Sequence, residues 1–339
     1  MNNYLKNINQ SLLPANHKNY SLLDLFAGCG GLSLGFEAVG FETISYEIEP
    51  SAVETYNKNL KGQCITEKLT LNTFYPQKVD IIIGGPPCQP FSVGGEQKGI
   101  QDERNGFPSF INAVKQLKPK LWLFENVRGM LYSNKHYFEK IIEELEAENY
   151  FIDYQLLNAV NFGVPQNRER LFVVGHYGGF NFPKPENYKV TVAEAIADLI
   201  DTVIDERKIL TPSMDAYIAK YEKASHCINP RDLYLHKPAR TLTCRNIAGS
   251  TGDMQRVKLK DGRRRRISVR EAARLQSFPD WFEFMGTETQ QFYQIGNAVP
   301  PLLAKYLADC VKKYLEQESY KCSKKKQRAN TIPLQMSLL

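Results

Sequence analysis

The sequence predicts an α/β protein with a doubly wound, mostly parallel sheet and a second, smaller domain. Apolar runs alternate with helix-like stretches from Ser21 to about Gly175, which is the rhythm that βαβ units produce. Two of these runs end in glycine-rich turns, as strands of ligand-binding α/β sheets do. The chain has 339 residues, enough for about two domains, and the rhythm breaks near Tyr177.

The elements of the first part follow from apolar runs and helical periodicity. Short continuous apolar runs predict buried strands, and apolar residues three or four positions apart predict helices. Pro50 suits the first turn of a helix. The predicted strands are Ser21–Phe26, Phe41–Tyr46, Val79–Ile83, Leu121–Phe124, Phe151–Leu157 and Leu171–Gly175. The predicted helices are Leu32–Val39, Pro50–Leu60, Phe107–Gln116 and Lys135–Glu148.

The second part begins with a linker at Tyr177–Asn187, which is rich in glycine and proline. Weaker periodicity up to about Arg266 predicts the smaller domain, and helices return at Ser268–Gln276 and Pro300–Glu316. We therefore divide the chain into a large domain, a smaller domain and a tail. Their predicted bounds are 1–180 with 288–320, 181–287 and 321–339, and we expect the basic tail to be disordered.

Composition excludes several classes of protein. Hydrophobic residues make up 42% of the chain and charged residues 24%, which excludes a disordered chain and a coiled coil. No apolar run approaches the roughly 18 residues of a membrane span, and the polar segment 1–19 does not resemble a signal peptide. The seven cysteines include no CxxC pair. We therefore expect no disulfide framework, no metal site and a reducing, cytoplasmic compartment.

Positive charge is concentrated in two segments. The net charge is +6, but Arg256–Arg274 and Lys321–Arg328 together hold more than that excess, so the rest of the chain is acidic. This asymmetry indicates a polyanionic partner such as nucleic acid. The alternative is an ordinary solvated basic surface with a lysine-rich tail.

A glycine-rich turn follows the first predicted strand. The sequence DLFAGCGGL at positions 24–32 joins a strand to a helix, and glycines there let the backbone approach a ligand closely. A dinucleotide-binding GxGxxG turn needs glycine where Ser33 stands, which disfavours a nicotinamide dehydrogenase. Glu47 ends the next strand, about 20 residues on, where a carboxylate can bond a ribose diol. We expect a nucleotide-cofactor turn; the alternative is a turn with a surface acid.

A cysteine follows the strand Val79–Ile83 in the sequence GGPPCQPFS at positions 84–92. The two prolines restrict the backbone before Cys88, and the carboxyl ends of parallel strands are where α/β sheets bind ligands. We expect Cys88 to act as a thiolate nucleophile, and the alternative is a small buried apolar side chain.

Further polar residues stand at the ends of the next strands. Glu125 ends an apolar strand, where a neutral carboxyl can donate a proton; it can equally cap a helix. Arg168 and Arg170 alternate on an extended segment, so both are expected to point the same way, toward a carbonyl or phosphate ligand. The alternative for them is a surface salt-bridge pair.

Together these motifs resemble those of the cytosine-C5 DNA methyltransferases. The resemblance covers most of the chain outside about 180–255, and the motifs follow one another in the family's order. They are DLFAGCGG at 24–31, GGPPCQPFS at 84–92, ENV at 125–127, QNRER at 166–170, REAARLQSFP at 270–279 and QIGNAVP at 294–300.

The resemblance implies a class I, Rossmann-like methyltransferase fold with S-adenosylmethionine as cofactor and no metal. It implies that Cys88 is the nucleophile and that Glu125, Arg168 and Arg170 hold the target base. The residues implied at the cofactor are Phe26, Gly28, Gly30, Leu32, Glu47, Ile48, Glu67, Pro87, Asn297 and Val299. Glu67 departs from the aspartate that the family usually has there. The smaller domain is then a target-recognition domain with its hinge.

Double-stranded DNA is the partner that the resemblance implies, bound in the cleft between the two domains. The pair Thr241-Leu242 resembles the Thr-Leu pair of the family's recognition region. The residues expected to contact DNA are Arg240, Thr241, Arg245, Asn246, Arg263, Arg264, Arg265 and Arg266. The alternative for the last four is a solvated hinge surface. We expect a monomeric bacterial modification enzyme, associated with the nucleoid through DNA, alongside a cognate restriction endonuclease.

Two other functions stay open from the sequence. A tRNA cytosine-5 methyltransferase would share Cys88 and Glu125, but that branch of the fold carries a Cys-Phe-Thr signature that this chain lacks. A non-catalytic nucleic-acid-binding relative would have lost the nucleophile or the acid, and both are present.

Overall fold

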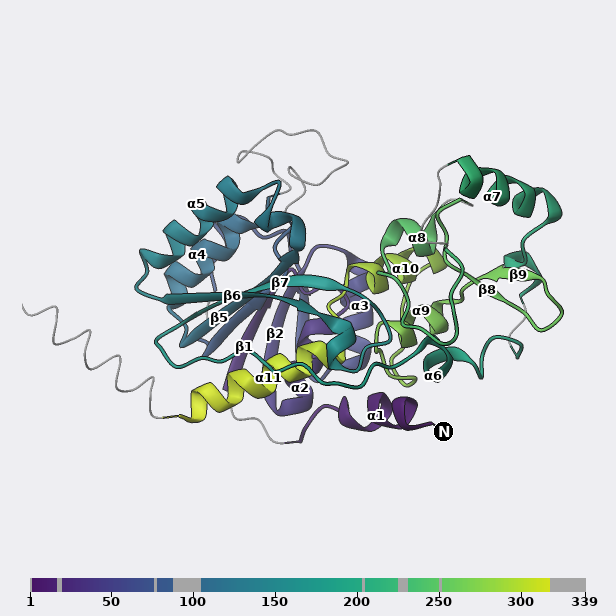
Figure 1. Ribbon diagram of the computed structural model, residues 1–339. Coiled ribbons are helices and arrows are strands. Elements are labelled where there is room, and N and C mark those ends of the chain that lie inside the picture. The colour runs from purple at the N-terminus through teal and green to yellow at the C-terminus, as the bar shows by residue number, and fades with distance from the viewer. Residues whose placement is uncertain are drawn as a thin grey trace, which may run out of the picture.

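A computed structural model confirms the predicted α/β architecture. It describes residues 2–16, 20–75, 78–87, 105–202, 205–224, 231–249 and 252–317. Seven strands form one sheet in the order β3-β2-β1-β4-β5-β7-β6 (Figure 1). The five strands β1 to β5 are parallel, β7 is antiparallel to β5, and β6 is antiparallel to β7. The strands are β1 (Tyr20–Leu25), β2 (Phe41–Glu47), β3 (Gln63–Thr66), β4 (Ile81–Gly84), β5 (Leu121–Val127), β6 (Phe151–Asn158) and β7 (Glu169–His176).

Every strand and helix predicted before residue 177 is present, with bounds that differ by a few residues. The α-helices are α1 (Asn3–Ser11), α2 (Gly31–Val39), α3 (Pro50–Asn59), α4 (Phe107–Leu117), α5 (Lys135–Glu146), α6 (Val192–Ile196), α7 (Pro212–Ala224), α8 (Cys244–Ala248), α9 (Val269–Leu275), α10 (Glu288–Asn297) and α11 (Pro301–Glu316). Short 3₁₀ helices are η3 (Arg128–Leu131), η4 (Ala159–Phe162) and η5 (Glu206–Lys208). The elements not predicted from the sequence include β3, a four-residue strand whose two end residues are exposed, and the helices α1, α6, α7, α8 and α10.

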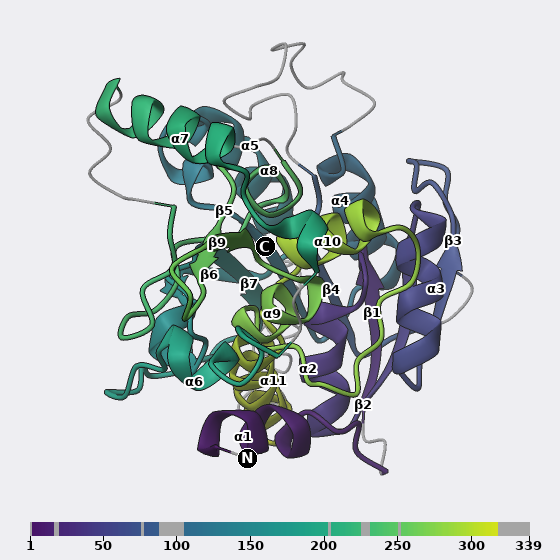
Figure 2. The same ribbon diagram turned by 90° about the vertical axis from the view of Figure 1, so that its right-hand side faces the viewer.

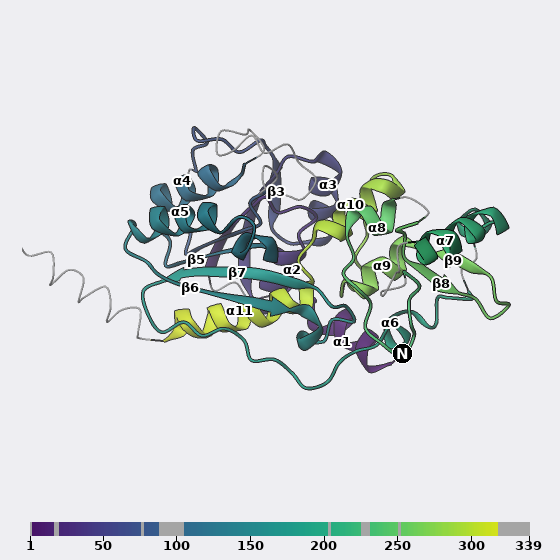
Figure 3. The same ribbon diagram turned by 45° about the horizontal axis from the view of Figure 1, so that its top comes forward.

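Alternate residues of the central strands enter two hydrophobic clusters, one on each face of the sheet. Leu22, Ile81 and Leu123 belong to the cluster packed by α2 and α11, whereas Leu23 and Trp122 belong to the cluster packed by α4 and α5. Because successive side chains of a strand point to opposite faces, a sheet buried on both faces needs continuous apolar runs. Figure 3 shows α4 and α5 on one side of the sheet and α11 on the other.

The C-terminal helix α11 packs directly on α2, although the two helices are far apart in the sequence (Figure 1). Gly35 of α2 permits this contact: a Cβ at that position would lie 2.4 Å from the backbone nitrogen of Lys305 and 2.5 Å from Cβ of Ala304. The two helix backbones therefore approach closely, and the helix that follows the glycine-rich turn is held by the last helix described.

The elements from α6 to α10 lie to one side of the seven-stranded sheet (Figures 1 and 2). They include a second, two-stranded sheet of β8 (Arg256–Lys258) and β9 (Arg264–Arg266), which pair antiparallel. Together with the loop between them, these strands form what we call the arginine hairpin, residues 256–266. Among the described residues, no helix is long and apolar enough to cross a membrane.

Candidate active site

The glycine-rich turn after β1 has a backbone that ordinary residues rarely adopt. Phe26, Gly28 and Gly30 have φ angles of 63°, 55° and 89°, a region that glycine enters without steric cost. A Cβ at Gly30 would lie 2.7 Å from the ring of Tyr56. The Gly28 N–H donates a 2.8 Å hydrogen bond to Oε2 of Glu47. The turn is therefore held against the carboxyl end of β2.

Glu47 is fixed by backbone donors on both of its carboxylate oxygens. Its Oε1 accepts hydrogen bonds from the N–H groups of Ile48 and Glu49 at 2.9 and 3.0 Å. Its backbone oxygen accepts one from the N–H of Glu67 at 2.9 Å. Ile48 is 53% exposed, and Glu67 is exposed as well. The structure thus gathers these three predicted cofactor residues at the carboxyl ends of β2 and β3.

Segments from three parts of the chain converge on this turn. The Gly106 N–H donates to the carbonyl of Pro87 at 3.0 Å. A Cβ at Gly106 would lie 2.5 Å from Cδ of Pro87 and 2.9 Å from the ring of Phe26. A Cβ at Gly31 would lie 2.5 Å from the carbonyl oxygen of Val299. The predicted cofactor residues Phe26, Pro87 and Val299 therefore surround one turn.

Two other predicted cofactor residues, Leu32 and Asn297, contact other parts of the structure than the turn. The side chain of Leu32 is buried in the hydrophobic cluster on the α2 face of the sheet. Asn297 is exposed at the end of α10, and its Oδ1 accepts a 3.1 Å hydrogen bond from Sγ of Cys244. Asn297 therefore joins α10 to α8, and its role at the cofactor remains a prediction.

A buried carboxyl group lies directly under the turn. Asp24 is 1% exposed; its Oδ2 accepts a 2.7 Å hydrogen bond from the Ser33 hydroxyl, and its Oδ1 has no partner. Burial raises the pKa of Asp24 to about 7, the Ser33 hydrogen bond opposes the shift, and the charge of Glu47 adds to it. Asp24 is thus half protonated near neutral pH.

Asp24→Asn should change how stability depends on pH. The folded protein holds this proton more tightly than the unfolded chain does, so the Asp24 contribution makes the free energy of unfolding fall as pH rises from about 4 to about 7. Above pH 7 the variant should therefore be more stable than the wild type, by a difference on the order of a few kcal/mol. Urea unfolding between pH 4.5 and 8.5, without cofactor, measures this difference.

Asp80→Asn is the matched control for that experiment. The Lys120 ammonium lies 2.7 Å from the Asp80 carboxylate, and hydrogen bonds from Lys120 and Ser21 hold the pKa of Asp80 below its usual value against the effect of burial. This substitution should lower stability at neutral pH. Parallel pH curves for the wild type and Asp24→Asn would contradict a neutral Asp24.

Cys88 lies outside the described residues, but its loop begins beside Glu125. Asn126 donates through Nδ2 to the carbonyl of Pro86 at 3.0 Å, and a Cβ at Gly85 would lie 3.7 Å from Oε2 of Glu125. The segment that leads into Cys88 is therefore attached to the end of β5.

Glu125 and Arg170 form a largely buried ion pair across neighbouring strands. Nε of Arg170 lies 2.8 Å from Oε1 of Glu125, and the two side chains are only 13% and 12% exposed. Burial raises the pKa of Glu125, although the guanidinium groups of Arg170 and Arg168 oppose this. Burial also lowers the pKa of Arg170. The pair can hold a proton on the carboxyl group and present a fixed guanidinium next to it.

Arg168 differs from the prediction that it holds a ligand. It is 0% exposed, and its guanidinium donates to the carbonyls of Leu242, Gly296 and Ala298 at 2.7, 2.9 and 2.9 Å. Arg168 stands one residue before β7, so the alternation of side chains that orients Arg170 within the strand does not apply to it. The guanidinium of Arg168 therefore joins the segment before β7 to the backbone at Leu242 and at residues 296–298.

Gln166 makes a similar connection, which the sequence did not predict. It is fully buried, its Oε1 accepts from the Leu242 N–H at 2.8 Å, and its Nε2 donates to Gln276. Thr241 donates to the carbonyl of Asn167 at 2.6 Å. The predicted Thr-Leu pair is thus bound to the segment before β7. The sequence did contain a signal for this connection, because Gln166 and Gln276 stand in the motifs QNRER and REAARLQSFP.

Three of the four arginines of 263–266 pair with acidic side chains. Arg265 is 1% exposed and pairs with Glu271 at 2.7 Å, which corrects the expectation that it contacts phosphate. Arg264 pairs with Asp215 and Asp232, and Arg263 with Asp261 and Glu206. The side chains of β9 alternate between its two faces, so the middle arginine points inward.

The other residues expected to contact DNA also differ in whether their side chains are accessible. The Arg245 side chain is 83% exposed and lies 3.3 Å from Asp253, so it is accessible. Arg240 is partly buried, and its Nη1 has no hydrogen-bond partner. Asn246 is buried and forms a capping box with Thr243 at the start of α8, which corrects its assignment to base reading.

No group of three or more histidine, cysteine, aspartate or glutamate side chains is placed to hold a metal ion within the described part of the chain. The polar residues of the site are instead carboxyl, guanidinium and amide groups at the carboxyl ends of β1, β2, β4 and β5. This is the edge at which open α/β sheets bind ligands.

Comparison with known proteins gives consistent matches over most of the chain. A family model described as C-5 cytosine-specific DNA methylase matches residues 20–313. The chain is 57% identical to Type II methyltransferase M.AplI of Arthrospira platensis, over 88% of this chain and 87% of that protein. It is 36% identical to Type II methyltransferase M.FnuDI of Fusobacterium nucleatum, over 87% and 94%.

Solved structures share the fold at lower identity. A putative DNA modification methyltransferase encoded within an E. coli prophage aligns with a TM-score of 0.65 and 24% identity, covering 88% of this chain and all of that chain. The S. pombe Dnmt2 methyltransferase aligns with a TM-score of 0.68 and 20% identity, with the same coverage. At these identities the likeness concerns the fold alone.

Proposed function

The chain belongs to the C-5 cytosine-specific DNA methylase family, and we propose that it transfers a methyl group from S-adenosylmethionine to C5 of a cytosine flipped out of duplex DNA. The family and the Type II relatives make it a cytosine-C5 DNA methyltransferase of the restriction–modification type. The cofactor, the covalent step and the roles of individual residues are our proposal.

The turn after β1 fits S-adenosylmethionine. Glycines at positive φ leave its backbone open to close approach, and the fixed carboxylate of Glu47 stands where a ribose diol can be bound. The exposed Ile48 and Glu67 lie beside it for the adenine. When bound, the sulfonium group supplies an electrophilic methyl group. Phe26, Gly28, Gly30, Pro87 and Val299 complete the proposed pocket.

The reaction needs a nucleophile because C5 of cytosine does not attack a methyl group by itself. In our proposal the Cys88 thiolate adds to C6, which makes C5 enamine-like and able to accept the methyl group. The methyl donor would leave as a neutral thioether. A water molecule takes the C5 proton, the electrons of the C5–H bond re-form the ring double bond and expel the Cys88 thiolate from C6, and 5-methylcytosine is released. Cys88 thus forms one bond and breaks it again within each turnover.

The observation that best supports this proposal is the buried Glu125–Arg170 pair beside the loop that leads to Cys88. Negative charge develops on the ring as sulfur adds. A protonated Glu125 can stabilise it at N3, and its burial favours that neutral form. Arg170 replaces Arg168 as the proposed donor to the ring carbonyl, because the Arg168 guanidinium is engaged by three backbone carbonyls.

We assign the elements from α6 to α9 to DNA binding, and the seven-stranded sheet with α10 and α11 to catalysis. This corresponds to a catalytic domain at 1–180 and 288–320 and a recognition domain at 181–287. The support is the position of α7, β8 and β9 to one side of the sheet (Figure 1). C6 cannot be reached inside a duplex, so the base must be flipped out at a cost of a few kcal/mol. The exposed Arg245 and Arg263, together with Arg240, Arg264 and Arg266, are the proposed contacts that offset this cost.

A duplex with 5-fluorocytosine at the modified position tests the covalent step. Bisulfite sequencing of DNA from cells that express the protein first identifies the sequence and the cytosine. The fluorinated duplex should then form a protein–DNA adduct that survives denaturing electrophoresis only when S-adenosylmethionine is present, because fluorine cannot leave as a proton does. Unmodified duplex and tRNA serve as controls. Absence of an adduct, with bisulfite showing methylation, would exclude the Cys88 pathway; methylation of tRNA alone would favour the RNA enzyme.

The proposed setting follows from the same relatives. Their names place them in Type II restriction–modification systems, so we propose a cognate endonuclease that cuts the same DNA sequence. We also propose a monomeric protein that works in the bacterial cytoplasm and meets the nucleoid through its DNA substrate.

A further inference from the structure

The N-terminal helix lies outside the part of the chain that the family model matches, residues 20–313, yet it is packed into the fold. Tyr4, Leu5, Ile8 and Leu12 are buried and belong to the same hydrophobic cluster as α6, α9 and α11. The opposite face of α1 is polar and exposed. Because a helix that buries one apolar face is positioned by its neighbours, α1 has a defined place between them.

The segment 2–16 makes contacts in both halves of the molecule. At its C-terminal end, the Ala15 N–H donates to the carbonyl of Glu37 at the end of α2 (2.9 Å), and Nζ of Lys61 donates to the carbonyl of Ala15 (3.0 Å). At its other end, Asn2 donates to the carbonyl of Glu194 in α6 and the Tyr4 hydroxyl to that of Arg274 in α9. The segment therefore connects the cofactor-binding half to α6 and α9.

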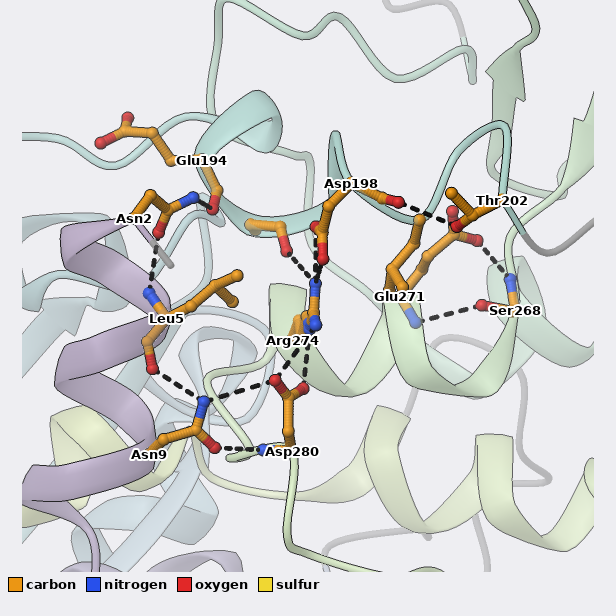
Figure 4. A network of polar contacts seen from close by, with 12 residues as sticks. Asn2, Leu5, Asn9, Glu194, Asp198, Thr202, Ser268, Glu271, Arg274 and Asp280 are labelled. Atoms are coloured by element: carbon orange, nitrogen blue, oxygen red, sulfur yellow. Dashed lines mark hydrogen bonds and ion pairs between the residues drawn. The ribbon is translucent and has the colours of Figure 1, made fainter.

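Asn9 makes the central contact of α1, with the chain just after α9 (Figure 4). Its Oδ1 accepts from the Asp280 N–H at 2.7 Å, and its Nδ2 donates to Oδ2 of Asp280 at 3.3 Å. The indole N–H of Trp281 donates to the carbonyl of Asn9 at 3.1 Å. Asn9 thus fixes both the backbone and the carboxylate of Asp280.

Asp280 in turn orients Arg274, which bonds α6 and Asp198, and the chain after Asp198 contacts the arginine hairpin. Arg274 bonds Asp280 through Nε and Nη2 at 2.7 and 3.0 Å, and its Nη1 bonds both oxygens of Asp198 at 2.7 and 2.9 Å. The carbonyl of Ile200, two residues after Asp198, accepts from Nη2 of Arg265 at 2.9 Å. Figure 4 shows Asn9, Asp280, Arg274 and Asp198 in one continuous set of contacts.

We propose that α1 is a positioning element that, through Asn9, Asp280 and Arg274, holds the arginine hairpin in the orientation required for DNA binding. The inference rests on the proposed function, which assigns this side of the molecule to DNA. The buried Arg274 bridges two partly exposed carboxylates, so the direction in which each carboxylate points depends on the other groups that bond it. Loss of Asn9 frees Asp280 to turn, and the contacts to Asp198 and the hairpin loosen with it.

Asn9→Ala in the full-length chain tests the proposal. We expect the KM for duplex DNA to rise about threefold to tenfold, a range typical of residues that act through a contact network. The KM for S-adenosylmethionine and kcat at saturating DNA should stay at wild-type values. Hydrogen exchange of the β8 and β9 amides, without DNA or cofactor, should be faster. Asn7→Ala, the same substitution at an exposed position of α1, should match the wild type in every measurement.

Two further variants keep the test decisive. Trp281→Phe keeps an aromatic side chain but loses the indole N–H that bonds Asn9, together with some ring volume. It should shift the KM for DNA in the same direction by less, even if Asn9→Ala folds poorly. Asp198→Asn combined with Asn9→Ala should be less than additive, since both act through Arg274. Wild-type hairpin exchange in Asn9→Ala, or an equal rise in the KM of both substrates, would overturn the positioning role. Absence of DNA methylation by the wild type would overturn the proposed function instead, because the exchange measurement needs no activity.

Discussion

Replacement of Cys88 by serine is expected to lower the rate of methyl transfer by at least about 10⁴-fold, the scale on which covalent enzymes lose activity without their nucleophile. A serine hydroxyl stays protonated at neutral pH, whereas a thiol ionises readily. C6 then receives no sulfur, and C5 does not become nucleophilic. Binding of duplex DNA and of S-adenosylmethionine should persist, because neither depends on the covalent bond.

Single-turnover transfer of a labelled methyl group measures this loss, and a filter or gel assay measures DNA binding. Cys310→Ser is the matched control, since Cys310 lies on α11 and is partly buried with no proposed contact to either substrate. It should methylate at the wild-type rate. A Cys88→Ser protein with that rate would remove Cys88 as the nucleophile and with it the proposed chemistry.

Glu125→Gln is expected to have the second-largest effect, a fall in kcat of about 10²- to 10⁴-fold, as for other general acids. An amide can donate a hydrogen bond to N3 but cannot transfer a proton to it. The active form of Glu125 is the protonated one, and burial raises its pKa. The wild-type kcat should therefore fall as pH rises through that raised pKa, and the variant should lose this dependence.

Glu169→Gln provides the comparison for this carboxyl group. Glu169 begins β7 near Arg170 but pairs with Arg128 at the surface, 2.9 Å away, so its loss should leave kcat and its pH profile unchanged. If Glu125→Gln kept both the wild-type kcat and the fall at high pH, proton donation would have to come from another group. Saturating concentrations of both substrates separate kcat from binding.

Much of the sheet could be predicted because its strands are buried on both faces. Continuous apolar runs such as Ile81–Gly84 are a strong signal when both neighbours are parallel strands. β3 gave little signal, since it is short and partly exposed. The helix α1 was missed because its polar face dominates its composition, and only tertiary contacts reveal that Tyr4, Leu5 and Ile8 are buried.

The sequence predicts which residues form the site more fully than it predicts which groups those residues contact. Glu125 and Arg170 were expected in one place, and the register of β5 with β7 explains why they meet. The prediction for Arg168 rests on its alternation with Arg170 and on the family resemblance, and that for Arg265 on its place in a run of basic residues. Both turned inward, Arg168 to three carbonyls and Arg265 to Glu271. A sequence shows that an arginine is present, but its partner depends on contacts between segments far apart in the chain.

The close packing of α11 on α2 through Gly35 has a consequence for biosynthesis. Synthesis proceeds from the N-terminus, and domains fold as their residues leave the ribosome. The helix that begins at Gly31 cannot be covered by α11 until residues 301–316 have also emerged, long after α2 itself. A polypeptide that stops before α11 therefore leaves this face of α2 uncovered, and we expect it to lack the close helix packing behind the glycine-rich turn.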